Sequence, residues 1–103
     1  MFLSAIRTGR RPAARSRSDT GLVRVRGGFR PDVVRAHAGK PIRIVFVREE
    51  TASCSERVVF PAFGRSTMLP YGEHVLVELP AAPPGTYEFT CAMRMLRGTL
   101  VVE

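Results

Sequence analysis

Apolar and polar residues alternate in short runs along most of the chain, and glycine or proline separates one run from the next. In the clearest run, residues 41–48, the apolar side chains of Ile42, Ile44 and Phe46 occupy every second position. Alternation with a period of two predicts a β-strand with one buried face. The same reasoning predicts strands over residues 21–26, 32–36, 41–48, 57–60, 74–79, 87–90 and 99–102.

These runs amount to about seven short strands, with a turn signal roughly every ten residues. No segment repeats its apolar residues at the period of an α-helix. Many short strands at this spacing are typical of an all-β sandwich. The connection over residues 61–73 is predicted to be irregular, although Phe63, Met68 and Leu69 give it apolar anchors. The predicted fold class is therefore an all-β Greek-key sandwich that spans residues 21–103.

Residues 1–20 differ in composition from the rest, because they are rich in arginine, serine and alanine. They hold five of the sixteen basic residues and a single acidic one. A segment of this kind is expected to be a disordered basic tail. It lacks the interleaved aromatic residues that stack on single strands, so no specific nucleic-acid partner is expected. Its apolar residues precede its charges, unlike those of a secretory signal, and no apolar run is long enough to span a bilayer.

Sulfur-bearing side chains follow the strand at residues 87–90 at alternate positions, as Cys91, Met93 and Met95. Gly98 is predicted to give a tight turn before the last strand. Cys54, the other of the two cysteines, comes just before the strand at residues 57–60. Thiolate and thioether sulfurs are soft donors, which select Cu(I) over hard cations. We therefore predict a copper site formed by Cys54, Cys91, Met93 and Met95, with Cu(I) favoured over Cu(II).

The same residues admit a structural interpretation. Cys54 and Cys91 could form a disulfide or be buried as small apolar residues, which would make the protein a structural or interaction β-sandwich without metal. Met68 is predicted to be buried and is only a reserve ligand. His37 and His74 have no partner at metal-ligand spacing. The carboxylates at positions 49, 50 and 56 are predicted to be solvated, although one of them could accept a hydrogen bond from a metal ligand or act as a hard ligand. No nucleophile–base pair or phosphate-binding loop is evident in the sequence, so no enzymatic activity is expected.

Several segments resemble those of cupredoxin-like domain proteins, including the EfeO type and small bacterial copper proteins. They are Gly27–Pro31, Gly39–Pro41, Cys54–Pro61 and the stretch from Pro84 through Cys91 to Gly98. The last is the most specific, because cupredoxins place a ligand cysteine at the end of a Y-x-F-x-C strand and further ligands in the loop that follows. The resemblance covers about residues 21–103 and implies a cupredoxin-like Greek-key sandwich that binds copper.

Blue-copper proteins of this fold use two histidines, a cysteine and a weakly bound methionine. Here Cys54 stands near the place of the first histidine, and Met93 and Met95 stand where the loop histidine is expected. The pattern is instead similar to that of cupredoxin-fold Cu(I) chaperones, which carry a C-x-M-x-M loop. This resemblance implies a copper chaperone or buffer with a tight site at Cys54 and Cys91 and a weaker outer site at Met93 and Met95. The alternative is an electron-transfer copper protein with an atypical ligand set.

The resemblance also bears on partners and location. Copper chaperones of this kind imply a copper-transporting ATPase or another copper acceptor as partner, and we expect a monomer. The missing signal pattern favours the cytoplasm, whereas the family resemblance also allows an exported or membrane-associated protein. The sequence leaves the location open.

Overall fold

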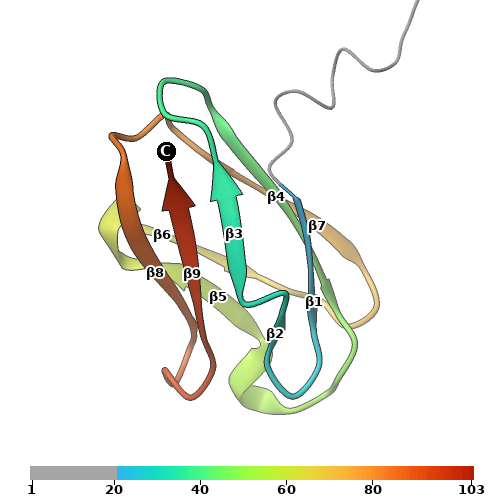
Figure 1. Cartoon of the computed structure of the whole chain (residues 1–103). Coiled ribbons are helices and arrows are strands. Elements are labelled where there is room, and N and C mark those ends of the chain that lie inside the picture. The colour runs from blue at the N-terminus through green and yellow to red at the C-terminus, as the bar shows by residue number, and fades with distance from the viewer. Residues whose placement is uncertain (1–20) are drawn as a thin grey trace, which may run out of the picture.

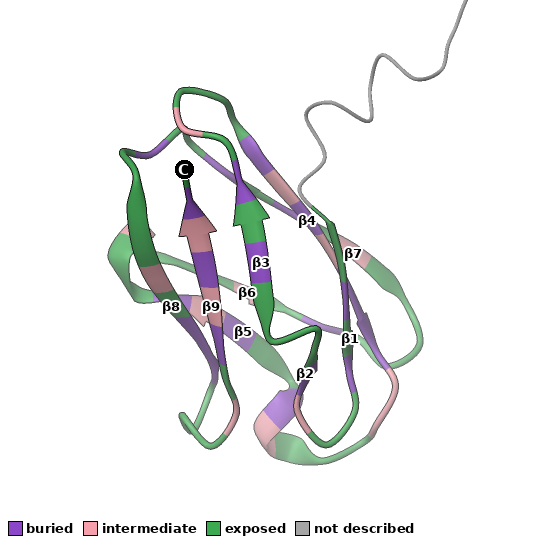
Figure 2. Ribbon diagram, in the orientation of Figure 1, coloured by how far each residue is buried: buried purple, intermediate pink, exposed green. Residues whose placement is uncertain are grey.

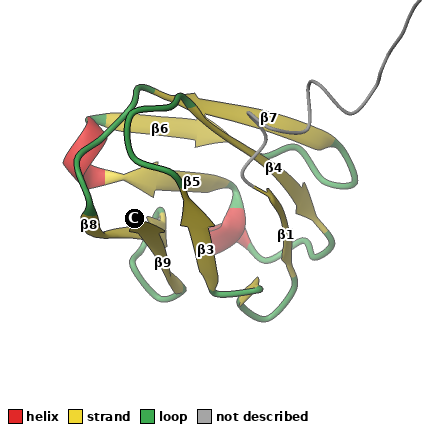
Figure 3. Cartoon of the chain, turned by 45° about the horizontal axis from the view of Figure 1, so that its top comes forward, coloured by secondary structure: helices red, strands yellow, loops and turns green. Residues whose placement is uncertain are grey.

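Strands and two single-turn 3₁₀ helices make up residues 21–103, which are the part of the chain that the computed structural model describes (Figure 1). The strands are β1 (Gly21–Val25), β2 (Phe29–Arg30), β3 (Val33–Ala36), β4 (Ile42–Arg48), β5 (Arg57–Phe60), β6 (Arg65–Met68), β7 (His74–Leu79), β8 (Gly85–Cys91) and β9 (Arg97–Val102). The 3₁₀ helices are η1 (Ser53–Ser55) and η2 (Pro61–Phe63). They lie immediately before and immediately after β5, as the red segments of Figure 3 show.

The strands form two sheets that pack face to face. The four-stranded sheet has the order β2-β1-β4-β7, and the five-stranded sheet has the order β3-β9-β8-β5-β6. Most neighbours are antiparallel, but β1 pairs with β4 and β3 pairs with β9 in parallel, so both sheets are mixed. The predicted all-β sandwich is confirmed.

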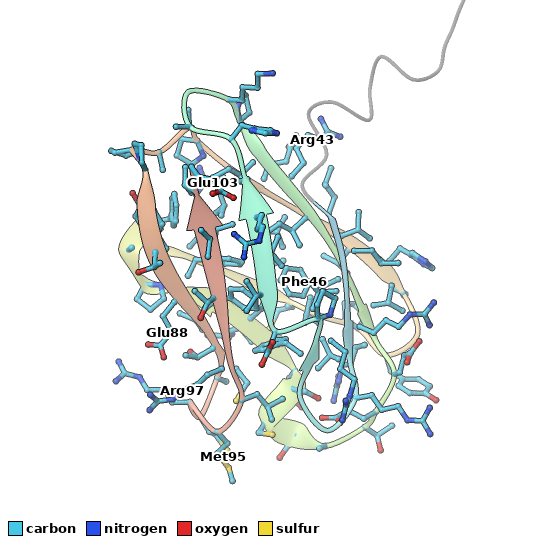
Figure 4. The ribbon with its side chains drawn as sticks, viewed as in Figure 1. Arg43, Phe46, Glu88, Met95, Arg97 and Glu103 are labelled. Carbon is cyan, nitrogen blue, oxygen red and sulfur yellow. The ribbon has the colours of Figure 1, made fainter. Side chains whose placement is uncertain are left out.

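Phenylalanine rings fill the space between the sheets. Phe89 of β8 lies with its ring centroid 4.9 Å from that of Phe29, 5.9 Å from that of Phe46 and 5.2 Å from that of Phe60. Phe46 is labelled between the two layers in Figure 4, and buried and exposed positions alternate along the strands in Figure 2. Burial of each such side chain contributes about 1.5–3 kcal/mol, so these rings dominate the stability of the sandwich.

Residues 21–103 form nine strands where the sequence predicted about seven. The missed strands are β2, which has only two residues, and β6, which lies at an edge of the five-stranded sheet. None of the four residues of β6 is buried, so the sequence there carries no apolar alternation to indicate a strand. The predicted burial of Met68 is wrong, because its side chain is 54% exposed at the end of β6.

Gly98 lies inside β9, opposite Phe89 of β8, and not in the tight turn that the sequence predicted. A Cβ atom placed on Gly98 would lie 2.3 Å from Cζ of the Phe89 ring. The glycine therefore makes room for the ring at the centre of the phenylalanine cluster. The turn before β9 is made instead by Arg94, whose φ is 60° and whose N–H donates to the carbonyl oxygen of Cys91 at 3.0 Å.

Gly98→Ala is expected to destabilise the protein by about 3 kcal/mol, because the added methyl group would displace the Phe89 ring from a close-packed core. The matched control is Gly21→Ala, since a Cβ on Gly21 would meet only a methyl group of Val34 at 3.9 Å. Urea unfolding monitored by circular dichroism measures both variants. Equal midpoints for the two variants would contradict the proposed steric role of Gly98.

The β8–β9 loop and the segment before β5 lie at one end of the sandwich, whereas the start of β1 and the C-terminus lie toward the opposite end (Figure 1). The predictions made for residues 1–20 fall outside the described residues. Within the described range, no helix combines the length and hydropathy that crossing a bilayer requires.

Candidate metal centre

Cys91 is the last residue of β8 and faces the interior of the sandwich. It lies in register with Val58 of β5 and is 1% exposed. Phe89, two residues earlier, points to the same buried face, as the period of a strand requires. The Cys91 thiol is therefore held by regular sheet structure at the point where the five-stranded sheet ends.

The β8–β9 loop turns back over the sulfur of Cys91. The backbone N–H groups of Met95 and Leu96 donate to Cys91 Sγ at 3.2 Å and 3.3 Å. The loop is closed by the Cys91 N–H, which donates to the Leu96 carbonyl oxygen at 3.1 Å. Hydrogen-bond donors aimed at a sulfur stabilise its thiolate form, which is the form that binds metals.

Cys54 reaches the same place from a different part of the chain. It is the middle residue of η1, and its carbonyl oxygen accepts a hydrogen bond from the N–H of Ala92 at 3.3 Å. The thiols of Cys54 and Cys91 lie near enough for each to shift the pKa of the other, and neither is in a disulfide. The fold thus brings together two free thiols that are 37 positions apart in the sequence.

The two thiols have opposite pKa shifts. Burial raises the pKa of Cys91, but the N–H groups of the β8–β9 loop and the Cys54 thiol outweigh burial and lower that pKa below the usual cysteine value. Burial also raises the pKa of Cys54, and the neighbouring Cys91 thiolate and Glu50 carboxylate raise it further. Cys91 therefore loses its proton first, and Cys54 holds its proton to higher pH.

The thioethers are not packed against the two thiols in the way that ligands of a closed site would be. The side chains of Met93 and Met95 are 63% and 73% exposed. Figure 4 shows Met95 pointing away from the sandwich at the tip of the β8–β9 loop. The structure brings Cys54 and Cys91 together and leaves both methionines at the surface beside them.

The carboxylates before Cys54 hold the loop that carries it. Glu49 forms an ion pair with Arg24 at 2.6 Å, and the Glu50 carboxylate accepts a hydrogen bond from the N–H of Gly27. The Glu49 N–H also donates to the Val25 carbonyl oxygen at 2.8 Å. These contacts fasten the loop to β1 and the β1–β2 turn, while both carboxylates stay partly exposed to solvent.

Sequence reasoning missed the contribution of Arg48 and Ser55. Arg48 ends β4 with its side chain buried, and it donates hydrogen bonds to Ser55 and to backbone carbonyls of the Cys54 loop and of Leu69. An arginine at the end of an apolar strand usually faces solvent. No signal in the sequence marks this one as buried.

The histidines do not take part in the site. His37 and His74 are both exposed, and His74 pairs in register with Val47. Across residues 21–103, no three side chains among His, Cys, Asp and Glu gather as a metal cluster.

Solved structures share this architecture. The metal-binding domain of the Cu(I)-exporting P-type ATPase CopA of Streptococcus pneumoniae D39, solved with Cu(I), matches with a TM-score of 0.79 and 22% identity over 84% of this chain and 87% of that one. A protein described as a copper-binding protein in its apo form matches with a TM-score of 0.77 and 36% identity over 84% of this chain and 89% of that one. Auracyanin from Roseiflexus castenholzii matches with a TM-score of 0.67 and 15% identity over 84% of this chain and 97% of that one.

A search of curated protein sequences found no match. The sequence does match a family model, that of the cupredoxin-like domain, over residues 1–102. The strand order described above and the 36% identical copper-binding protein agree with that match. The chain belongs to the cupredoxin-like domain family.

Proposed function

We propose that this protein is a Cu(I) chaperone or buffer that holds the ion between the thiolates of Cys54 and Cys91. The observation that carries the proposal is that two free thiols are brought to one place, where the N–H of Ala92 donates to the Cys54 carbonyl oxygen and two backbone N–H groups donate to the Cys91 sulfur. Thiolates are preferred ligands of Cu(I). The exposed methionines beside the two thiols suit an ion that is carried rather than retained, because they offer weak soft ligands at the surface.

The charge balance fits a monovalent ion. Two neutral thiols become two thiolates when the metal replaces their protons, so the thiolates and one Cu(I) sum to a single negative charge. The N–H groups of Met95 and Leu96 are placed to stabilise that charge on Cys91. Within residues 21–103, no three side chains among His, Cys, Asp and Glu gather here, and both histidines are exposed, which disfavours Cu(II) and Zn(II) at this place.

The comparisons support the cargo and the class of acceptor. One structural relative, 36% identical, is a copper-binding protein, and another is the metal-binding domain of a Cu(I)-exporting ATPase. We propose an ATPase of that class, or another Cu(I) acceptor with soft ligands, as the partner that receives the ion. A monomer that exposes its metal-binding end would leave Met93 and Met95 free to contact such an acceptor.

A competition titration with a chromophoric Cu(I) chelator tests the proposal on the reduced protein. The protein is expected to remove one equivalent of Cu(I) from the chelator and to develop no intense visible band when Cu(II) is added. A strong Cu(II)–thiolate band would support electron transfer instead. Failure to take Cu(I) from the chelator would overturn the proposed function and leave the structural β-sandwich as the better interpretation.

Replacing Met93 and Met95 with leucine is expected to leave the tight site nearly intact. Leucine keeps the apolar volume but removes the thioether sulfur, so the variant should lose only weak Cu(I) uptake beyond the first equivalent and should exchange Cu(I) with the chelator more slowly. Stopped-flow transfer and equilibrium titration measure the two effects separately. Met68→Leu, which removes an exposed thioether from β6, is the matched control. A loss of the first equivalent would show that the methionines belong to the tight site.

A further inference from the structure

The loop that carries Cys54 is fastened from inside by one arginine. The Arg48 guanidinium donates from Nε to Ser55 Oγ at 3.0 Å, from Nη1 to the Leu69 carbonyl oxygen at 3.1 Å and from Nη2 to the Ala52 carbonyl oxygen at 2.9 Å. The Ser55 hydroxyl in turn donates to the Ala52 carbonyl oxygen at 2.9 Å. Residues on both sides of Cys54 are therefore bound to the same planar group.

The backbone of Arg48 is fixed as well as its side chain. Its carbonyl oxygen accepts the N–H of Gly72 at 2.8 Å, and the residue pairs with Val25 at the end of the parallel β1–β4 ladder. A side chain anchored in this way fixes η1 relative to the four-stranded sheet, to which β4 belongs. Cys91, by contrast, belongs to the five-stranded sheet. Arg48 thus links the four-stranded sheet to the turn that carries Cys54. On its other side that turn is bonded to the β8–β9 loop through the Ala92 N–H and the Cys54 carbonyl oxygen.

The environment of Arg48 is unusual for a charged residue. It is 8% exposed, and within residues 21–103 no carboxylate forms an ion pair with it. Burial of a charge that only neutral acceptors satisfy is costly, so an ordinary core position would favour an apolar residue. Its three acceptors are the Ser55 hydroxyl and the backbone carbonyl oxygens of Ala52 and Leu69. Burial of the Arg48 charge therefore serves to hold the turn around Cys54.

We propose that Arg48 is a positioning residue, which holds the η1 turn so that the Cys54 thiol meets the Cys91 thiol before the metal arrives. It touches no ligand atom and acts through Ser55 and the backbone of the loop. The statement that Arg48 affects Cu(I) binding rests on the proposed function. If Arg48 holds the turn, the two thiols are in place before the metal binds, so that binding does not have to order the loop.

Arg48→Lys tests this inference, because lysine keeps the charge but cannot reach three acceptors with one planar group. The variant is expected to bind Cu(I) about 10- to 100-fold more weakly than the natural protein in the chelator titration. Amide hydrogen exchange on the metal-free protein should also show faster exchange at Ala92, whose N–H donates to the Cys54 carbonyl oxygen. Ser55→Ala, a milder change in the same network, is expected to move both readouts in the same direction by a smaller factor.

Leu79→Ala is the control for a general loss of stability. Leu79 is buried and pairs with Ile42 at the far end of β4, six residues from Arg48. This variant should unfold at lower denaturant concentration and keep the natural Cu(I) affinity. Natural affinity and natural Ala92 exchange in both Arg48→Lys and Ser55→Ala would overturn the inference. If the natural protein itself fails to bind Cu(I), the proposed function fails, and with it the proposed effect of Arg48 on Cu(I) affinity. The exchange rate of the Ala92 N–H would still decide whether Arg48 holds the turn.

Discussion

Replacement of both Cys54 and Cys91 with serine is expected to lower Cu(I) affinity by on the order of a thousandfold or more, which corresponds to at least about 4 kcal/mol. Serine is nearly isosteric with cysteine, but its hydroxyl is a hard and weakly acidic donor that Cu(I) does not favour. The exposed thioethers of Met93 and Met95 would remain and would supply only weak binding. The chelator titration described above measures the loss directly.

The single variants separate the contributions of the two thiols. Cys91→Ser leaves a hydroxyl that can still accept the N–H groups of Met95 and Leu96, so the loop should keep its fold while the buried sulfur ligand is lost. Cys54→Ser removes the ligand on η1 instead. Each single variant should bind Cu(I) far more weakly than the natural protein, and Ser53→Ala, at an exposed neighbour of Cys54, should bind it normally. Tight binding by the double variant would contradict a thiolate site.

The second large effect is a fall in Cu(I) affinity as the pH is lowered. Protons compete with the metal for both sulfurs, so binding displaces every proton that the free thiols still hold. The pKa of Cys54 is raised, so its proton is displaced at neutral pH, whereas the lowered pKa of Cys91 means that its proton is lost at lower pH. Apparent affinity should therefore fall about 10-fold per pH unit between the two pKa values and about 100-fold per unit below both.

Titrations in a series of buffers, corrected for the pH dependence of the chelator, measure this slope. The two thiols interact, so the slopes describe the pair rather than either residue alone. Cys91→Ser provides the control, because a single remaining thiol can release only one proton and the steeper region should disappear. Affinity that does not change with pH would indicate thioether ligands alone and would contradict the roles given to Cys54 and Cys91.

Much of the architecture could be predicted because most strands bury one face, so that the two-residue period is visible. Strand β6 was not predicted because none of its residues is buried. Gly98 was predicted to lie in a turn, whereas it faces the Phe89 ring of the neighbouring strand β8. Contacts of that kind depend on the register between strands, which a single sequence does not reveal.

The candidate site was predictable to the extent that it follows from side-chain chemistry. Two cysteines and a pair of alternating methionines indicate a soft-metal site, and the structure brings the two thiols together. The choice of ligands stays a prediction. The sequence carried no sign of the N–H donors to Cys91 Sγ or of the buried Arg48, because both arise from how the backbone folds around the thiols. Hydrogen bonds to backbone atoms leave no residue-type signature.

The position of the chain ends in the described domain sets how the protein can be attached to something else. The start of β1 and the C-terminus lie toward the end of the sandwich opposite the β8–β9 loop. An affinity tag, a surface linker or a fusion partner joined at either point would therefore orient the thiol-bearing end outward. Immobilised protein should retain an accessible copper site, so sensor-chip measurements of metal and acceptor binding do not need a special choice of coupling end.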